Sequence, residues 1–391
     1  KAIERDPTHA LAYHGRGIVY AQQGRLQEAL QDFTKAIELD DALTAVYRNR
    51  GLVHLQLGEL DAALADFSQA IELAPEEAEP YRSRGNVLKR RGDLAGAIAD
   101  YSSAIDIDPY LDLAYGNRAA ARLEQGDVEG ALADYTKALE LRENAEAYRG
   151  RAAAHERAGK LDDAMADYTK AVALAPEKFR AYFERGNLRV TQGDREGALI
   201  DYAKALEVDS GAVEVYLQRA EVLQRAGDLA GAVVDYTTVI ELTADYPDEE
   251  TWVAYYSRGV LKGRQEDVEG ARADYTKTIE LNPAAIDAYV NRGALRLQRH
   301  DLEGAMDDYS HVIAFDPARV QAYVTRGLIR LQQDDFDGTI ADTTKAIEMK
   351  PDFAEAYNNR AAARLKLGDR RGAVDDLEQA VRYASPSFKD T

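Results

Sequence analysis

The chain has 391 residues, of which 46% are hydrophobic and 30% charged, and it contains 28 glycines but only 10 prolines. This composition excludes a disordered or fibrous chain and is typical of a packed protein. The formal net charge is −20, from 69 acidic and 49 basic side chains, and it would repel a phosphate backbone, so we expect no nucleic-acid partner.

A short pattern recurs along the whole chain: a tyrosine, an arginine three residues later and a small residue directly after the arginine. It begins at eleven tyrosines: Tyr13, Tyr47, Tyr81, Tyr115, Tyr148, Tyr182, Tyr216, Tyr255, Tyr289, Tyr323 and Tyr357. The usual spacing is 34 residues, with one residue fewer after Tyr115 and five more after Tyr216. Such spacing indicates an array of similar repeats.

Each repeat predicts two amphipathic helices of about 14 residues, because apolar side chains recur at steps of three and four residues. A turn such as Gly92-Asp93 or Gly193-Asp194 separates the two helices, and proline closes most repeats. A helical hairpin this short cannot bury its own apolar face. Neighbouring hairpins are therefore expected to stack into an elongated solenoid.

The repeats predict the organisation of the chain. Residues 1–9 are expected to end a preceding repeat, residues 10–246 to form repeats 1 to 7, and residues 247–391 to form repeats 8 to 11 with a short C-terminal tail. Because the chain opens part-way through a repeat, we expect its natural N-terminus to lie upstream. No apolar run approaches membrane-spanning length, so no membrane insertion is expected.

Small and aromatic residues occupy fixed positions in each repeat, which we number so that the leading tyrosine is place 4. Place 8 is glycine or alanine, place 20 is alanine except for Thr339, place 24 is aromatic in nine repeats, and place 27 is usually alanine. This pattern resembles the tetratricopeptide repeat family, whose signature has aromatic residues at places 4 and 24, small residues at 8, 20 and 27, and proline at 32. The resemblance implies an all-α, right-handed α-solenoid superhelix of about eleven helix-turn-helix repeats plus a partial N-terminal repeat.

Two charged residues occur in every repeat. Place 7, commonly leucine in the family, is always arginine, and place 23 is always aspartate. In an antiparallel hairpin that turns near place 15, facing places add up to roughly 31, so place 7 lies close to place 23. The sequence therefore predicts an Arg–Asp pair in each repeat. We interpret the pair as a structural clasp rather than a ligand site, because partly buried Arg–carboxylate forks are strong and costly to break.

The largest irregularity is the five-residue insertion within residues 243–251, which precedes the only tryptophan, Trp252. Asp248 is expected to cap the next helix, so that this helix starts about one turn early. In the three following turns, glycine at place 15 is replaced by Glu266, His300 and Asp334. Non-glycine residues are costly there if the backbone is left-handed. The insertion is thus a candidate bend or loose joint, and a drifted repeat without a role is the alternative.

The resemblance also implies a concave groove lined by the first helix of each repeat, with places 2, 5, 6, 9, 12 and 13 facing inward. In repeats 3 to 5 these places hold a basic and polar strip: Arg82, Asn86, Lys89, Arg90, Asn117, Arg149 and Arg157. We expect this strip to bind a peptide or protein partner, and its charge favours an acidic one.

Three interpretations of the strip stay open. Some family members clamp the C-terminal carboxylate of heat-shock chaperones, and Arg82, Asn86 and Asn117 match three of the five clamp residues. The other two positions hold Glu146 and Gly150, and Glu146 would oppose an anion. The second interpretation is a general acidic-peptide site, and the third is a solvated polar face.

No catalytic, metal or cofactor site is predicted. Cysteine is absent, which excludes thiolate metal sites and a cysteine nucleophile, and the six histidines lie at non-equivalent places. His155-Glu156 lacks the second histidine of a zinc-binding helix. The sequence therefore predicts a non-catalytic protein–protein interaction scaffold. The alternatives are the recognition or regulatory arm of a larger enzyme or transport complex, and a scaffold that self-assembles into a homo-oligomer.

Overall fold

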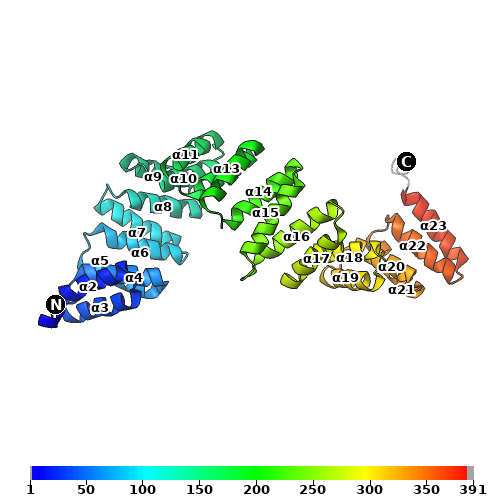
Figure 1. Ribbon diagram of the computed structural model, residues 1–391, viewed down its shortest axis with the longest axis horizontal. Helices are drawn as coiled ribbons and strands as arrows, with labels where there is room; N and C mark the ends of the chain where they lie inside the picture. The colour runs from blue at the N-terminus through cyan, green and yellow to red at the C-terminus, as the bar shows by residue number, and fades with distance from the viewer. Residues whose placement is uncertain (1, 385–391) are drawn as a thin grey trace. The chain divides into compact units, whose positions relative to one another are not determined.

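In a computed structural model that describes residues 2–384, the chain is all α-helix, with no strand among those residues (Figure 1). A four-residue helix, α1 (Ala2–Arg5), precedes eleven helical hairpins. The first helices of the hairpins are α2 (Ala10–Gln22), α4 (Thr44–Leu57), α6 (Ala78–Arg90), α8 (Asp112–Gln125), α10 (Ala145–Arg157), α12 (Phe179–Thr191), α14 (Val213–Ala226), α16 (Glu249–Arg264), α18 (Ile286–Gln298), α20 (Val320–Gln332) and α22 (Ala354–Lys366). The second helices are α3 (Leu26–Leu39), α5 (Leu60–Leu73), α7 (Leu94–Ile107), α9 (Val128–Leu141), α11 (Leu161–Leu174), α13 (Arg195–Val208), α15 (Leu229–Leu242), α17 (Val268–Leu281), α19 (Leu302–Phe315), α21 (Phe336–Met349) and α23 (Arg370–Ala384).

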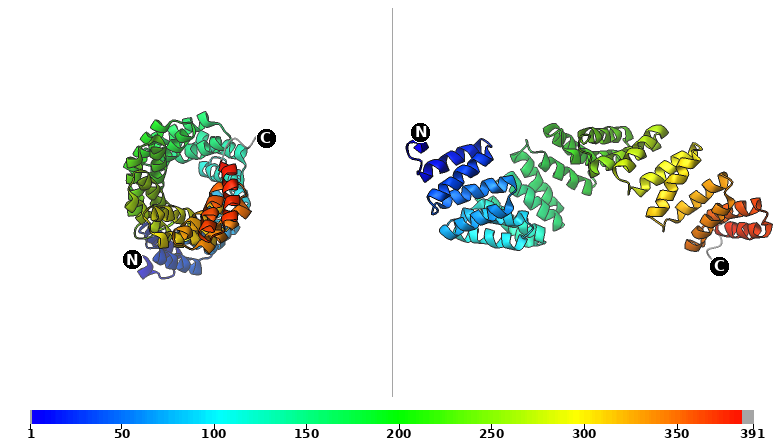
Figure 2. Two further views of the ribbon diagram at one scale, coloured as in Figure 1. Left: turned by 90° about the vertical axis from the view of Figure 1, so that its right-hand side faces the viewer. Right: turned by 90° about the horizontal axis from the view of Figure 1, so that it is seen from below.

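The chain divides into two compact blocks, which we name the N-terminal block (residues 1–208) and the C-terminal block (residues 209–391). Within each block the second helix of one repeat packs against the first helix of the next, so the hairpins stack one on another (Figures 1 and 2). The α-solenoid expected from the sequence is thus confirmed. The boundary between residues 246 and 247 stays a prediction, and the expected C-terminal tail, residues 385–391, lies outside the described residues.

Small residues let the two helices of a hairpin approach closely. The alanines of places 20 and 27, such as Ala97 and Ala104, have no exposed surface. At place 8, a Cβ on Gly85 would lie 2.7 Å from Cε1 of Tyr101, which is closer than packed atoms allow. The Tyr101 ring at place 24 is itself completely buried. The aromatic residue at place 24 and the small residue at place 8 therefore recur because the ring packs directly over the small residue.

The Arg–Asp pair predicted from places 7 and 23 is confirmed in all eleven repeats of the described chain. In each, Nε and Nη2 of the arginine donate to the two carboxylate oxygens of an aspartate sixteen residues further on. The aspartates are buried, whereas most of the arginines are only partly exposed. This two-point geometry joins the two helices of a hairpin.

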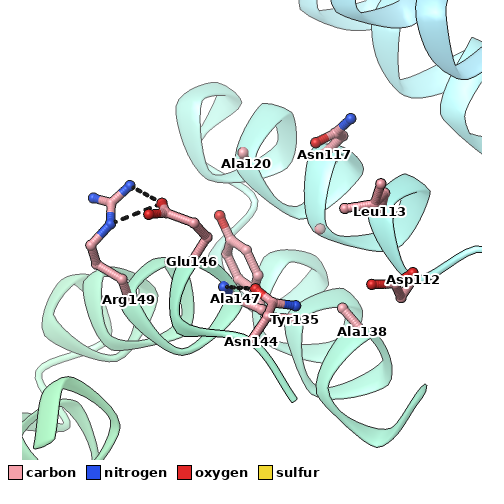
Figure 3. Close-up of a pocket in the computed structure, with 12 residues that line it drawn as sticks. Asp112, Leu113, Asn117, Ala120, Tyr135, Ala138, Asn144, Glu146, Ala147 and Arg149 are labelled. Carbon is pink, nitrogen blue, oxygen red and sulfur yellow. Dashed lines mark hydrogen bonds and ion pairs between the residues drawn. The ribbon is translucent and has the colours of Figure 1, made fainter. Parts of the chain in front are cut away.

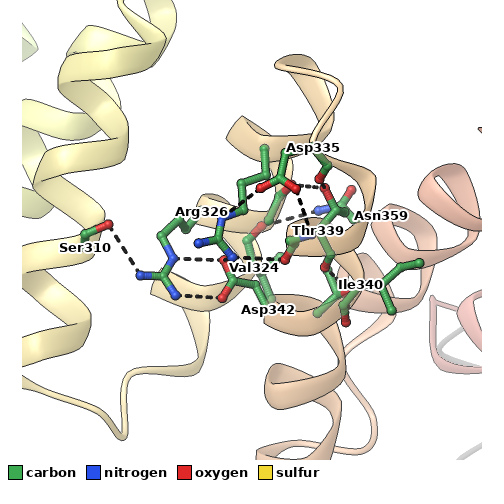
Figure 4. Close-up of polar contacts among 12 residues, drawn as sticks. Ser310, Val324, Arg326, Asp335, Thr339, Ile340, Asp342 and Asn359 are labelled. Atoms are coloured by element: carbon green, nitrogen blue, oxygen red, sulfur yellow. Dashed lines mark hydrogen bonds and ion pairs between the residues drawn. The ribbon is translucent and has the colours of Figure 1, made fainter.

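The same arginines also reach the preceding repeat, a contact that the sequence did not lead us to expect. Nη1 of Arg326 donates to Oγ of Ser310 on α19, 3.4 Å away, while the rest of the guanidinium holds Asp342 on α21 (Figure 4). The equivalent bond to a serine or threonine at place 25 of the preceding repeat recurs at Arg50, Arg84, Arg118, Arg151, Arg185, Arg258, Arg292 and Arg360. One arginine thus joins three helices and links successive repeats.

A second cation contacts the buried aspartate in six repeats. It lies at place 11 and is one of Arg122, Arg189, Lys262, Arg296, Arg330 and Arg364. In the repeat of α18 and α19, Arg292 and Arg296 contact the Asp308 carboxylate at 2.6 and 2.8 Å. The aspartate is therefore the centre of a small charged network.

The turn between the two helices of a hairpin is left-handed at place 15. Eight repeats have glycine there with φ between 73° and 94°, and the other three have Glu266, His300 and Asp334 with φ of 63°, 60° and 58°. The following aspartate often caps the second helix, as where the Asp93 carboxylate accepts from the amide of Gly96. The sequence-based concern about these three turns is confirmed, because each holds a side chain in the region that favours glycine.

We expect Glu266→Gly to stabilise the chain by about 0.5–1 kcal/mol, since relief of left-handed strain exceeds the entropy that glycine adds to the unfolded chain. His300→Gly and Asp334→Gly should gain less stability, because histidine and aspartate tolerate the left-handed backbone better than glutamate does. The measurement is the urea concentration at the midpoint of unfolding for each full-length variant, with unfolding monitored by circular dichroism. A lower midpoint for Glu266→Gly than for the parent would contradict the prediction.

The insertion before α16 forms a capped helix start. The Asp248 carboxylate accepts from the amide of Thr251 at 3.2 Å, and the Thr251 hydroxyl accepts from the amide of Asp248 at 3.0 Å. The expected N-cap and the early start of the helix are confirmed, since α16 has 16 residues. Val239 of α15 and Leu261 of α16 belong to one buried cluster, so apolar packing continues across the insertion.

Among the described residues, none of the helices combines the length and the apolar character that a transmembrane span requires.

Candidate functional site

The first helices of successive repeats contact one another within the N-terminal block. Contacts join α2 to α4, α4 to α6, α6 to α8 and α8 to α10. A hydrogen bond between His14 and Asn49, 2.9 Å long, bridges the first of these pairs. Helices that meet in this way form one continuous row. We call the surface of α6, α8 and α10 in this row the groove face.

The predicted site residues of α6 already have partners. Arg82 donates from Nε and Nη2 to the Glu79 carboxylate at 2.9 and 2.6 Å. Lys89 pairs with Glu124 of α8 at 2.8 Å. Arg90 is exposed and donates to the backbone carbonyl of Leu55 on α4. Two of the three predicted cations on α6 are therefore balanced by carboxylates.

Asn86 and Asn117, both expected in the strip, contact each other in the structure. Oδ1 of Asn86 accepts from Nδ2 of Asn117 at 2.8 Å and from the Tyr101 hydroxyl at 2.8 Å. The pair joins α6 to α8. Because the Asn117 amide uses its nitrogen on this bond, its Oδ1 remains as an acceptor on the groove face.

The predicted cations of α10 differ in their surroundings. Arg149 donates to Glu146 at 2.7 Å (Figure 3). It also donates to Glu184 of α12 at 2.6 Å. Burial raises the pKa of Glu184, and the nearby Arg149 guanidinium opposes this shift. Arg157 is exposed and donates to the backbone carbonyl of Leu123. Arg149 thus lies between two carboxylates, whereas Arg157 has no carboxylate partner among residues 2–384.

The positions of the carboxylate clamp contain no additional cation. Glu146 is exposed and pairs with Arg149, and Gly150 lies beneath the Tyr135 ring. A Cβ at Gly150 would lie 2.4 Å from the Cζ atom of that ring. The clamp therefore stays a hypothesis from three matching residues.

A pocket of about 210 Å³ lies between α8 and α10. Its polar lining includes Asn117, Tyr135 and Arg149, and Figure 3 shows the Tyr135 ring between the two helices. Gly116 and Ala120, which also line it, leave the space open because they carry little or no side chain.

The Tyr135 hydroxyl was not among the site residues expected from the sequence. The other six tyrosines at place 24 in the described chain pair their hydroxyls with a side chain: Asn86 for Tyr101, Glu156 for Tyr168, Asn187 for Tyr202, Ser257 for Tyr236, Asn291 for Tyr275 and Thr325 for Tyr309. These partners occupy place 9 or 12 of the same repeat or place 6 of the next. Around Tyr135 the three places hold Ala120, Leu123 and Gly150, and no hydrogen bond to its hydroxyl is found within residues 2–384. These three residues, which cannot pair with a hydroxyl through their side chains, are the feature of the sequence that indicates an unpaired Tyr135 hydroxyl.

Burial raises the pKa of Tyr135 to about 12, so its hydroxyl remains a proton donor at neutral pH. Elsewhere in residues 2–384, no group of three or more histidine, aspartate or glutamate side chains is placed to hold a metal ion.

Comparison with known proteins identifies the class of this solenoid. Family models described as tetratricopeptide repeat match residues 48–112, 117–178, 183–247 and 256–320, and further models of the same description match residues 10–41 and 354–386. The chain belongs to the tetratricopeptide repeat family. This membership supports a protein-interaction scaffold, which is generally non-catalytic in this fold.

Several solved structures are similar to this chain at low identity. A tetratricopeptide repeat protein from Parabacteroides merdae is 18% identical, with a TM-score of 0.52 over 64% of this chain and 98% of its own. YrrB, described as having an unusual peptide-binding site, is 23% identical over 46% of this chain and 93% of its own, with a TM-score of 0.38. Yeast Tom70 is 18% identical over 96% of this chain and 92% of its own, with a TM-score of 0.34. No curated protein sequence matches the chain.

Proposed function

We propose that the chain is a scaffold that binds peptide segments of partner proteins on the groove face of α6, α8 and α10. The observation that carries this proposal is the pocket between α8 and α10, which opens on a row of contacting helices whose side chains differ from repeat to repeat. Variable side chains on a regular framework allow recognition without altering the packing beneath them.

The charges of the groove face favour acidic groups at two points. Arg90 and Arg157 are exposed and lack a carboxylate partner among residues 2–384, whereas Arg82, Lys89 and Arg149 are already paired. Arg90 and Arg157 both occupy place 13, two repeats apart. At about 10 Å between contacting helices, their separation is about 20 Å, which an extended peptide spans in roughly six residues. We expect the preferred peptides to carry acidic residues at that spacing.

The test uses an array of peptides that differ in their content of glutamate, glutamine and lysine, with binding of selected peptides measured by fluorescence anisotropy. The parent should prefer peptides with two glutamates roughly six residues apart. Arg90→Gln/Arg157→Gln should lower the affinity for such a peptide about fivefold at low salt, and less at high salt, because exposed ion pairs are individually modest and screened.

Two double variants serve as controls. Lys277→Gln/Lys345→Gln removes the same charge from exposed lysines on second helices, and it should leave the affinity unchanged. Arg82→Gln/Arg149→Gln removes paired cations of the groove face and should weaken the acidic preference less than the Arg90/Arg157 variant. Equal binding of acidic and neutral peptides by the parent, or no peptide binding at all, would contradict the proposed function.

A further inference from the structure

We propose that the pocket between α8 and α10 accepts an uncharged amide side chain, glutamine or asparagine, from the bound partner. In this arrangement the Tyr135 hydroxyl donates to the amide oxygen, and Oδ1 of Asn117 accepts from the amide nitrogen. The inference deepens the proposed function and rests on it, because the amide is taken to belong to a peptide on the groove face.

The first step is the hydroxyl that lacks a partner. Tyr135 is only 6% exposed and lines the pocket, yet the residues that would pair with it are Ala120, Leu123 and Gly150. The hydroxyl oxygen is not among the fully buried polar atoms that lack a partner, so it is open to the pocket rather than enclosed in the hairpin core. Among the seven tyrosines at place 24 in the described chain, this unpaired hydroxyl coincides with a pocket. A ligand that supplies an acceptor would satisfy it.

The second step is the kind of group that fits. Asn117 presents an acceptor, since its nitrogen already donates to Asn86. The charges that line the pocket are already paired: Arg149 pairs with Glu146 and Glu184, and Asp112 pairs with Arg142 at 2.7 Å. A carboxylate would approach Glu146 and has no hydrogen for Asn117. A primary amide has both the acceptor and the donors that these two side chains require, and it carries no charge.

The third step is size. The pocket has a volume of about 210 Å³. An apolar cavity of about 150 Å³ is large enough to hold benzene. The pocket is therefore large enough for one side chain of glutamine size. Gly116 has open space where a Cβ would stand, so a side chain added there would enter this volume.

The experiment measures binding of N-acetylglutamine methylamide to the full chain by saturation-transfer difference NMR. The corresponding glutamate and methionine derivatives are compared, one of them charged and the other apolar. The parent is expected to bind the glutamine derivative with a dissociation constant in the range of about 1–10 mM and the other two at least about tenfold more weakly.

Two variants locate the binding. Tyr135→Phe should lower the affinity for the glutamine derivative at least about tenfold without lowering the melting temperature, because its hydroxyl has no bond to lose. Gly116→Leu fills the pocket and should abolish binding, and a retained melting temperature shows that it folds. The matched control is Tyr202→Phe, whose hydroxyl donates to Asn187 at 2.6 Å. This variant should lower the melting temperature and leave the affinity for the glutamine derivative unchanged.

Unchanged binding in Tyr135→Phe would overturn the inference, as would equal binding of the three derivatives or no binding at about 50 mM ligand. These results are independent of the peptide array. Acidic peptides that bind without any response to the glutamine derivative would overturn the amide pocket alone. A response to the derivative in a chain that binds no peptide would overturn the groove-face proposal.

Discussion

Replacing Asp308 by alanine is expected to accelerate amide hydrogen exchange in α18 and α19 at least about 100-fold, equivalent to a local loss of about 3–5 kcal/mol. The Asp308 side chain is 2% exposed and contacts both Arg292 and Arg296. Removing it leaves two partly buried guanidinium groups without their shared carboxylate. Because each repeat depends mainly on its neighbours, the change should fade within one or two repeats.

The measurement is hydrogen–deuterium exchange of the full chain followed by mass spectrometry. Glu348→Ala is the control, because it breaks an exposed ion pair with Lys345 and should change exchange by no more than about fivefold. Equal exchange in the parent and in Asp308→Ala would show that the Arg–Asp pair does not act as a clasp. Acceleration that also reaches α2 and α3 would contradict the local nature of the effect.

Tyr202→Ala is expected to destabilise the repeat of α12 and α13 by about 3–5 kcal/mol, as large buried aromatic residues generally do when truncated. The ring is completely buried and lies over Gly186, where a Cβ would be 2.7 Å from its Cε1 atom. Alanine would leave a cavity that the glycine beneath cannot fill. Exchange in α12 and α13 reports the effect at the repeat, and the melting temperature reports it for the whole chain.

Tyr110→Ala is the control for this prediction, because that tyrosine is 81% exposed and its loss should cost less than about 0.5 kcal/mol. Tyr202→Phe should lie between the two, since it keeps the ring and loses the bond to Asn187. If Tyr202→Ala melts within a degree or two of Tyr110→Ala, the aromatic at place 24 is not the centre of the hairpin core.

The helical hairpin was predictable because the contacts that define it lie within one repeat. Places 7 and 23 face each other because of hairpin geometry, so the spacing of Arg326 and Asp342 alone predicts that they pair. The cap at Asp248 is equally local. Contacts within one or two turns, or across one short hairpin, depend on spacing that a sequence displays directly.

The candidate site was predicted less completely, because its contacts run between repeats. Arg149 reaches Glu184 and Lys89 reaches Glu124 only because successive first helices lie side by side. Sequence spacing of about one repeat does not reveal which of several side chains will meet, since this depends on the crossing angle of the helices. The strip therefore looked more basic in the sequence than the folded groove face is.

The serine and threonine at place 25 were visible in the sequence and were overlooked, because we considered partners for arginine only within its own hairpin. Tyr135 was overlooked for a different reason. Its unpaired hydroxyl is indicated only by the lack of a polar residue at places 9 and 12 of its repeat and at place 6 of the next. This pattern can be interpreted only when the usual partners of Tyr101 and Tyr202 are known.

The joint that each arginine makes with the preceding repeat has a mechanical consequence. In the C-terminal block, Thr276 with Arg292, Ser310 with Arg326 and Thr344 with Arg360 form equivalent joints of 3.2, 3.4 and 3.1 Å. Because the joints are alike, we expect a pulling force along these repeats to load them similarly. Removal of one hydroxyl should then weaken the joint of that repeat alone.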